Sequence, residues 1–243
     1  HCQCRRQRQM CIRDSIQWQR FCDLSWYHDD LGVWLDISRM HVNATDLQQL
    51  QPRMDKAFAA MQELEAGAIA NPDEQRQVGH YWLRTPELAP SSELQQHISR
   101  EIDLIAAFGR DVINGTIKAP NGEAFTDVLW IGIGGSGLGP ALMIKALQNP
   151  GEGLPFHFFD NVDPNGMSNV LAGLEGRLDR TLVVTVSKSG GTPEPHLGME
   201  QARHRLEAAG GQWAGQAVAV TMLDSKLDPV SYTHLRAHET GPY

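Results

Sequence analysis

The sequence predicts an α/β protein in which a parallel-sheet αβα sandwich over residues 125–229 follows a mainly helical segment over residues 16–124. Two observations predict this fold. After residue 125, short apolar runs alternate with stretches of helical spacing, which is typical of parallel strands joined by right-handed crossovers. Before residue 125, apolar residues instead recur at spacings of three and four, as in amphipathic helices.

Four apolar runs supply the expected strands, and they cover residues 128–133, 156–159, 181–186 and 217–221. Each run is almost continuously apolar, which indicates strands that are buried on both faces of a sheet. The helices expected between them cover residues 138–147, 167–178 and 194–209. In such sheets ligands bind at the carboxyl ends of the strands, so the loops that follow these runs are the first place to look for a site.

The N-terminal segment is expected to be helical with loops. Its clearest stripes of apolar residues cover residues 47–64 and 94–108, and a shorter helical stretch begins near Trp18. Val33, Leu35 and Ile37 alternate with Trp34 and Asp36 and give a possible short strand. We expect this segment to pack against the sheet.

Composition excludes several classes of protein. Of the 243 residues 41% are hydrophobic, which suits a globular core, and the formal net charge is −8. Such a charge disfavours nucleic acid and anionic membranes as partners. No apolar run approaches the about 20 residues that a membrane-spanning helix needs, and no signal peptide is evident, so we expect a cytoplasmic protein. An anionic substrate would need local donors such as a helix N-terminus.

The two ends of the chain differ from its body. Residues 1–15 (HCQCRRQRQMCIRDS) and 230–243 (VSYTHLRAHETGPY) lack helical or strand periodicity. We interpret them as non-native read-through tails that pack on nothing, with genuine disordered tails as the alternative. All four cysteines lie early in the chain, in neither a disulfide nor a zinc-binding pattern, so we expect no metal site.

A glycine-rich loop follows the first expected strand. Residues 132–137 read GIGGSG, and glycines there let the backbone turn sharply and approach a ligand. The following helix offers unpaired N–H groups and a positive dipole end, and the Ser136 hydroxyl adds a donor. The loop also fits the dinucleotide pattern G-x-G-x-x-G, with Asp160 or Asp163 near the expected acidic position. This loop alone does not separate a nucleotide from a sugar phosphate, or either of them from a plain turn.

A second donor-rich loop follows the third expected strand. Residues 187–194 read SKSGGTPE and place Ser187, Lys188, Ser189 and Thr192 around two glycines. Thr192 suits a helix N-cap, and the proline after it suits the first helical position. A phosphate monoester carries three acceptor oxygens, which two such loops can fill with charge-assisted hydrogen bonds. The two loops together therefore favour a phosphate-binding site.

The body of the sequence, residues 16–229, resembles the glucose-6-phosphate isomerase family, particularly its bacterial and cyanobacterial type. The resemblance is carried by NPDEQR at 71–76, HYWLR at 80–84, FDNVDP at 159–164 and the two loops. The loops are typical of the sugar isomerase (SIS) fold. The resemblance implies that Gly135 and Ser136 line a sugar-phosphate site, and that Ser187, Lys188, Ser189 and Thr192 hold the phosphate. It also implies that the full-length enzyme interconverts glucose 6-phosphate and fructose 6-phosphate as a homodimer, without a cofactor.

The resemblance also implies what the chain lacks. Family members move a proton between C2 and C1 through an enediol, using a glutamate, a histidine, an arginine and a lysine from later motifs. We find neither the G-G-R-x-S segment nor the later histidine motif, and we expect an inactive N-terminal fragment with no catalytic residue. The alternatives are a non-catalytic SIS module that senses a sugar phosphate and a nucleotide-dependent oxidoreductase, and the second of these does not account for residues 187–192.

Overall fold

The computed structural model describes residues 14–73, 75–149, 151–222, 224–227 and 233–236. It divides into two compact units, His1–Gln62 and Glu63–Tyr243. This division falls earlier in the chain than the boundary near residue 125 that the sequence suggested. The N-terminal cysteines and most of the two tails lie outside the described residues.

The described part of the first unit contains a helical stretch, a hairpin and the start of a long helix. Residues 14–24 are helical, and the strands β1 (Ser25–His28) and β2 (Val33–Asp36) pair antiparallel. The Arg20 guanidinium donates hydrogen bonds to the carbonyl oxygens of Ser38 and Val42, both at 2.6 Å. It also donates to the carbonyl of Met40, so the side chain ties the helical stretch to the chain after the hairpin.

Helix α2 (Ala44–Glu65) begins with a reciprocal cap. The Asn43 side chain accepts hydrogen bonds from the backbone N–H groups of Thr45 and Asp46, and the Asp46 carboxylate accepts the N–H of Asn43 in return. Periodicity predicted this helix correctly. None of its residues is buried, however, and its apolar stripe is exposed in this structure.

The second unit is built on a parallel sheet, as the sequence predicted. Its strand order is β6-β5-β7-β8-β9, and every neighbouring pair is parallel. The bounds are β5 (Asp127–Ile131), β6 (Phe156–Phe159), β7 (Thr181–Val186), β8 (Ala217–Thr221) and β9 (Thr233–Arg236). Three of these strands match the predicted runs residue for residue. The first strand instead ends at Ile131, because the chain turns into the glycine loop two residues earlier than its apolar letters suggest.

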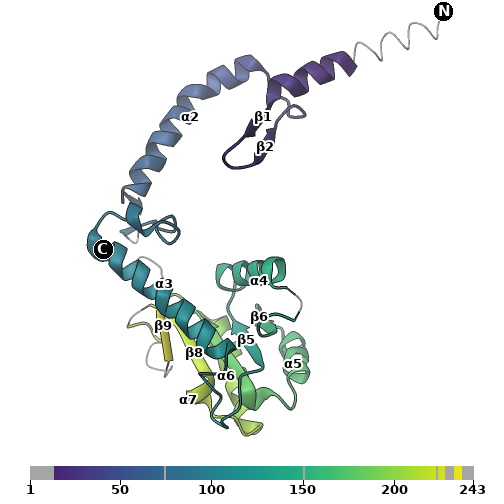
Figure 1. Ribbon diagram of the computed structural model, residues 1–243, viewed down its shortest axis with the longest axis vertical. Coiled ribbons are helices and arrows are strands. Elements are labelled where there is room, and N and C mark those ends of the chain that lie inside the picture. Colours follow the sequence, from purple (N-terminus) through teal and green to yellow (C-terminus); the bar gives the residue numbers. More distant parts are fainter. Residues whose placement is uncertain (1–13, 74, 150, 223, 228–232, 237–243) are drawn as a thin grey trace, which may run out of the picture. The chain divides into compact units, whose positions relative to one another are not determined.

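Apolar side chains cover both faces of the sheet, which confirms the expectation drawn from its continuous apolar strands. One face carries Leu129, Ile131 and Val183 against helices α5 (Pro164–Gly173) and α6 (Pro193–Ala208). The other face carries the residues in between, among them Val128, Leu182 and Val184. It packs against the C-terminal half of α3 (Ser92–Ile113), which lies over the strands in Figure 1. The predicted packing of a preceding helix on the sheet therefore holds for α3.

The remaining elements are short, apart from α4 (Gly135–Leu147), which follows the glycine loop. They are β3 (Ile69–Asn71) with β4 (Arg76–Gln77), the 3₁₀ turns η1 (Pro86–Leu88) and η2 (Leu178–Arg180), and α7 (Trp213–Gln216). The helix expected over 167–178 ends at Gly173. Gly176 has a φ of +75°, a left-handed conformation that stops the helix before the turn η2.

Strand β9 overturns one expectation. Thr233–Arg236 pairs with β8 in parallel register, so the tail over residues 230–243 does not lie free of the fold along its whole length. The edge strand of a sheet has unpaired backbone N–H and C=O groups. A short extended segment can pair with them even when its sequence shows no apolar pattern. The read-through origin of the two ends stays a prediction.

Candidate functional site

The two predicted loops lie at the same edge of the sheet. Strands β5 and β7 are neighbours and run parallel, with Ile131 opposite Thr185, so their carboxyl ends meet side by side. Each strand is followed by a glycine-containing turn and then by a helix, α4 or α6. The structure thus places two helix N-termini and their donor-rich turns next to each other, the arrangement that favours anions.

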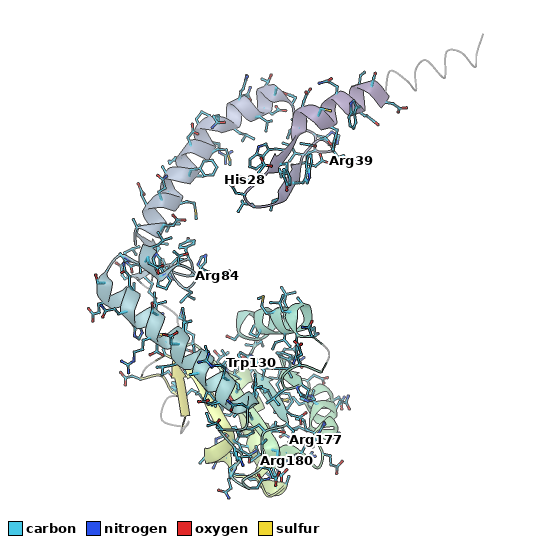
Figure 2. The ribbon with its side chains drawn as sticks, viewed as in Figure 1. His28, Arg39, Arg84, Trp130, Arg177 and Arg180 are labelled. Atoms are coloured by element: carbon cyan, nitrogen blue, oxygen red, sulfur yellow. The ribbon has the colours of Figure 1, made fainter. Side chains whose placement is uncertain are left out.

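The first loop turns directly into helix α4. Gly134 has a φ of +56°, in the left-handed region, and it precedes Gly135 and Ser136 in the first turn of the helix. The indole N–H of Trp130 donates a hydrogen bond of 2.8 Å to the backbone carbonyl of Ser136. Trp130, labelled in Figure 2, therefore fixes the turn from the strand below it, a role that the sequence pattern did not indicate.

The second loop joins β7 to α6 and holds its hydroxyl groups close together. The Ser187 hydroxyl, whose residue is 5% exposed, donates to the Thr192 hydroxyl oxygen at 3.4 Å. The Ser189 hydroxyl accepts the N–H of Gly191 at 3.2 Å. Thr192 occupies the N-cap position of α6, as expected, but its side chain caps no N–H group. Its hydroxyl faces Ser187 instead.

The chain after β8 supports the second loop from the neighbouring side. The Thr221 hydroxyl donates to the Ser187 carbonyl at 2.7 Å, and the N–H of Met222 donates to the Lys188 carbonyl at 3.2 Å. The Thr221 and Ser225 hydroxyl oxygens are 2.6 Å apart. The sequence analysis missed these supporting residues. Thr221 ends the fourth apolar run and Ser225 follows it, and turns carry such polar residues without any functional role.

The structure therefore gathers all six predicted binding residues at one edge of the sheet. Gly135 and Ser136 begin α4, while Ser187, Lys188, Ser189 and Thr192 occupy the turn before α6. These groups supply hydroxyl and ammonium donors together with two helix N-termini. In chemical terms the arrangement can hold a compact anion with several oxygens.

The histidines and acidic residues near the motifs have other positions. His157 contacts the buried Asp127 through Nε2 at 2.8 Å, at the amino end of the sheet and so away from the loops. His80 and His196 are exposed. Asp163 caps helix α5 by accepting the N–H groups of its first turn, so the acidic position of the dinucleotide pattern serves a structural purpose.

Two further findings concern metals and membranes. Among the described residues, no group of three or more histidine, cysteine, aspartate or glutamate side chains is placed to hold a metal ion. No helix within the described ranges is long and apolar enough to span a bilayer.

Comparison with known proteins gives consistent results. The family model "Phosphoglucose isomerase" matches residues 36–230. Over 213 residues the chain is 99% identical to a glucose-6-phosphate isomerase of Synechococcus sp. (strain CC9605), and over 214 residues it is 54% identical to that of Prochlorococcus marinus (strain MIT 9211). Each match covers 88% of this chain and 40% of the relative.

A solved structure resembles the fold as well. The crystal structure of a glucose-6-phosphate isomerase from Chlamydia trachomatis aligns with a TM-score of 0.76 and 28% identity, over 92% of this chain and 43% of the other. The chain thus spans about two fifths of the length of the relatives that it matches.

Proposed function

We infer the function of this chain from the premise that it belongs to the phosphoglucose isomerase family. We propose that it carries the phosphate-binding part of a glucose-6-phosphate isomerase and binds glucose 6-phosphate and fructose 6-phosphate through their phosphate group. The observation that carries this proposal is the meeting of two donor-rich strand–loop–helix turns at the carboxyl ends of β5 and β7.

The second loop is proposed to hold the phosphate. A phosphate monoester presents three oxygens and a charge of about −1.5 to −2 at neutral pH. The hydroxyl groups of Ser187, Ser189 and Thr192 supply donors, the Lys188 ammonium supplies charge, and the N-terminus of α6 adds its dipole. Gly135 and Ser136 of the first loop would line the sugar side of the same site.

The isomerisation itself belongs, in this proposal, to the full-length protein. Moving a proton between C2 and C1 needs a base within hydrogen-bonding reach of both carbons, and such catalysis contributes about 10²–10⁴-fold to rate. The phosphate lies far from these carbons, so gripping it stabilises substrate and transition state alike unless it also positions them. The chain therefore binds without turnover, and the full-length enzyme, proposed to be a homodimer that uses no cofactor, supplies the rest.

Removing two hydroxyl groups of the second loop tests the proposed site. Replacing Ser187 and Thr192 together by alanine removes two donors to a charged group, each contributing about 1.5–3 kcal/mol. We expect the affinity of the 243-residue chain for glucose 6-phosphate to fall by more than tenfold. Isothermal titration calorimetry measures the effect directly.

The matched control replaces Thr116 and Ser168, both exposed and outside the two loops, by alanine. That variant loses the same two functional groups and should bind like the parent chain. Equal affinity of the Ser187/Thr192 variant and the parent would show that the phosphate lies elsewhere.

A further inference from the structure

The chain that follows β8 crosses directly over the second loop. Gly190 has a φ of +62°, and a Cβ atom built on it would lie 2.4 Å from the backbone nitrogen of Leu227 and 3.0 Å from that of Lys226. Leu227 is 4% exposed and belongs to the core on one face of the sheet. Its burial anchors the crossing, so the residue before it is held in place over the loop.

Lys226 extends along the loop from this anchored position. Measured from the point where a Cβ of Gly191 would stand, the Lys226 Cδ lies at 3.6 Å and its Nζ at 3.8 Å. The Ser189 hydroxyl oxygen lies at 3.7 Å from the same point. The ammonium of Lys226 and the hydroxyl of Ser189 therefore border the same small space, which is open because Gly191 has no side chain.

The electrostatics of this space call for an anion. Lys226 is exposed and forms no ion pair with any residue in the described ranges. Gly191 immediately precedes the N-cap of α6, so the positive end of that helix borders the same space, and Glu194 is the acidic residue in its first turn. A helix N-terminus and the Lys226 ammonium both favour an anion in this space.

We propose that Lys226 is a further phosphate ligand, whose ammonium donates to a phosphate oxygen held by residues 187–192. The proposal rests on the proposed function, because it adds a residue to the same site. It also gives the chain from the end of β8 onward a second purpose. Thr221 and Met222 support the second loop, and Lys226 adds a cation for its ligand.

The absence of a side chain at Gly191 leaves room for a phosphate oxygen beside Lys226. The φ of Gly191 lies outside the left-handed region, and a Cβ there would meet only ordinary van der Waals contacts, all at 3.6 Å or more. An alanine at position 191 is therefore compatible with the fold, but its methyl group would stand between Lys226 and Ser189. Gly191→Ala thus tests the space itself without removing any polar group.

The experiment titrates the 243-residue chain with glucose 6-phosphate and, separately, with inorganic phosphate in a calorimeter. We expect Lys226→Gln to weaken binding of both ligands about tenfold or more, because it removes a charge-assisted hydrogen bond. Lys226→Arg keeps the charge and should stay within about threefold of the parent. Gly191→Ala should weaken both ligands as well. Lys118→Gln, an equal change of charge at an exposed residue before β5, is the control and should bind like the parent.

The outcomes separate the two proposals. If the parent binds glucose 6-phosphate and Lys226→Gln binds it equally well, the role of Lys226 is wrong and the proposed function stands. A second outcome is that Lys226→Gln binds inorganic phosphate more weakly than the parent, while the parent binds glucose 6-phosphate no more tightly than inorganic phosphate. The anion site then stands, and the sugar-phosphate function is wrong. If the parent binds neither ligand while circular dichroism shows it folded, both proposals are overturned. If Lys118→Gln weakens binding as much as Lys226→Gln does, the effect comes from the net charge of the protein, and the assignment of Lys226 is overturned.

Discussion

Replacing Asp127 by alanine is expected to lower the free energy of unfolding of the second unit by about 3 kcal/mol, because two hydrogen bonds to a buried carboxylate are lost. The Asp127 side chain is 1% exposed. It accepts from the Thr126 hydroxyl at 2.8 Å, contacts His157 Nε2 at 2.8 Å and lies 3.5 Å from Arg177 Nε. Alanine leaves the Thr126 hydroxyl and the His157 ring without this acceptor at the amino end of the sheet. Arg177, labelled in Figure 2, keeps its hydrogen bond to the Gly173 carbonyl.

This loss is a large share of the free energy of unfolding of a small domain, which totals about 5–15 kcal/mol. Amide hydrogen exchange of strands β5, β7 and β8 measures it without interference from the first unit. The control is Asp179→Ala, which removes a carboxylate whose partner Asn121 is exposed, and it should cost less than about 1 kcal/mol. Equal protection of the sheet in Asp127→Ala and the parent would contradict the assigned role of the buried carboxylate.

Replacing Gly137 by alanine is expected to disrupt the first loop and lower the free energy of unfolding by about 3 kcal/mol. A Cβ on Gly137 would lie 2.3 Å from the carbonyl oxygen of Gly132, and a Cβ on Gly132 would lie 2.6 Å from that of Ser136. These contacts are with backbone atoms, which cannot swing aside as a flexible side chain can. The turn must open, and Ser136 then moves away from the indole of Trp130.

Gly139→Ala is the matched control, because it lies two residues further along the same helix with no atom within 4 Å of its Cβ position. It should raise stability slightly, by up to about 1 kcal/mol, since alanine is the better helix former. Thermal unfolding of the two variants provides the comparison. A Gly137→Ala protein as stable as Gly139→Ala would mean that the tight turn between β5 and α4 is wrong.

The parallel sheet was predictable from sequence because its strands are buried on both faces. Residues 181–186 read TLVVTV, and a run this rich in valine, leucine and threonine without alternation indicates a central strand. The helix α3 was predictable because its apolar residues recur at helical spacing, although Ile102 and Ile105 of that stripe are exposed. The hairpin β3–β4 and the strand β9 carry no such pattern, and only the backbone pairing in the structure identifies them.

The part of the candidate site that lies within the two loops was predictable from sequence. Glycines and hydroxyl residues directly after a strand mark a turn that approaches a ligand, and both loops met at the expected edge. The contributions of Trp130, Thr221 and Lys226 depend on tertiary proximity, which no spacing along the chain records. Each of them reaches a loop from another element or from the chain beyond it, so only the fold could place them.

Calorimetry of the 243-residue chain with glucose 6-phosphate, fructose 6-phosphate and glucose, paired with an isomerase assay on the same sample, tests the central claim most directly. The claim is that the chain grips the phosphate and lacks the groups that act on C1 and C2. The expected result is equal affinity for the two hexose phosphates, no detectable binding of glucose and no interconversion. Glucose binding as tightly as glucose 6-phosphate would contradict the phosphate site, and measurable isomerisation would contradict the absence of a catalytic base.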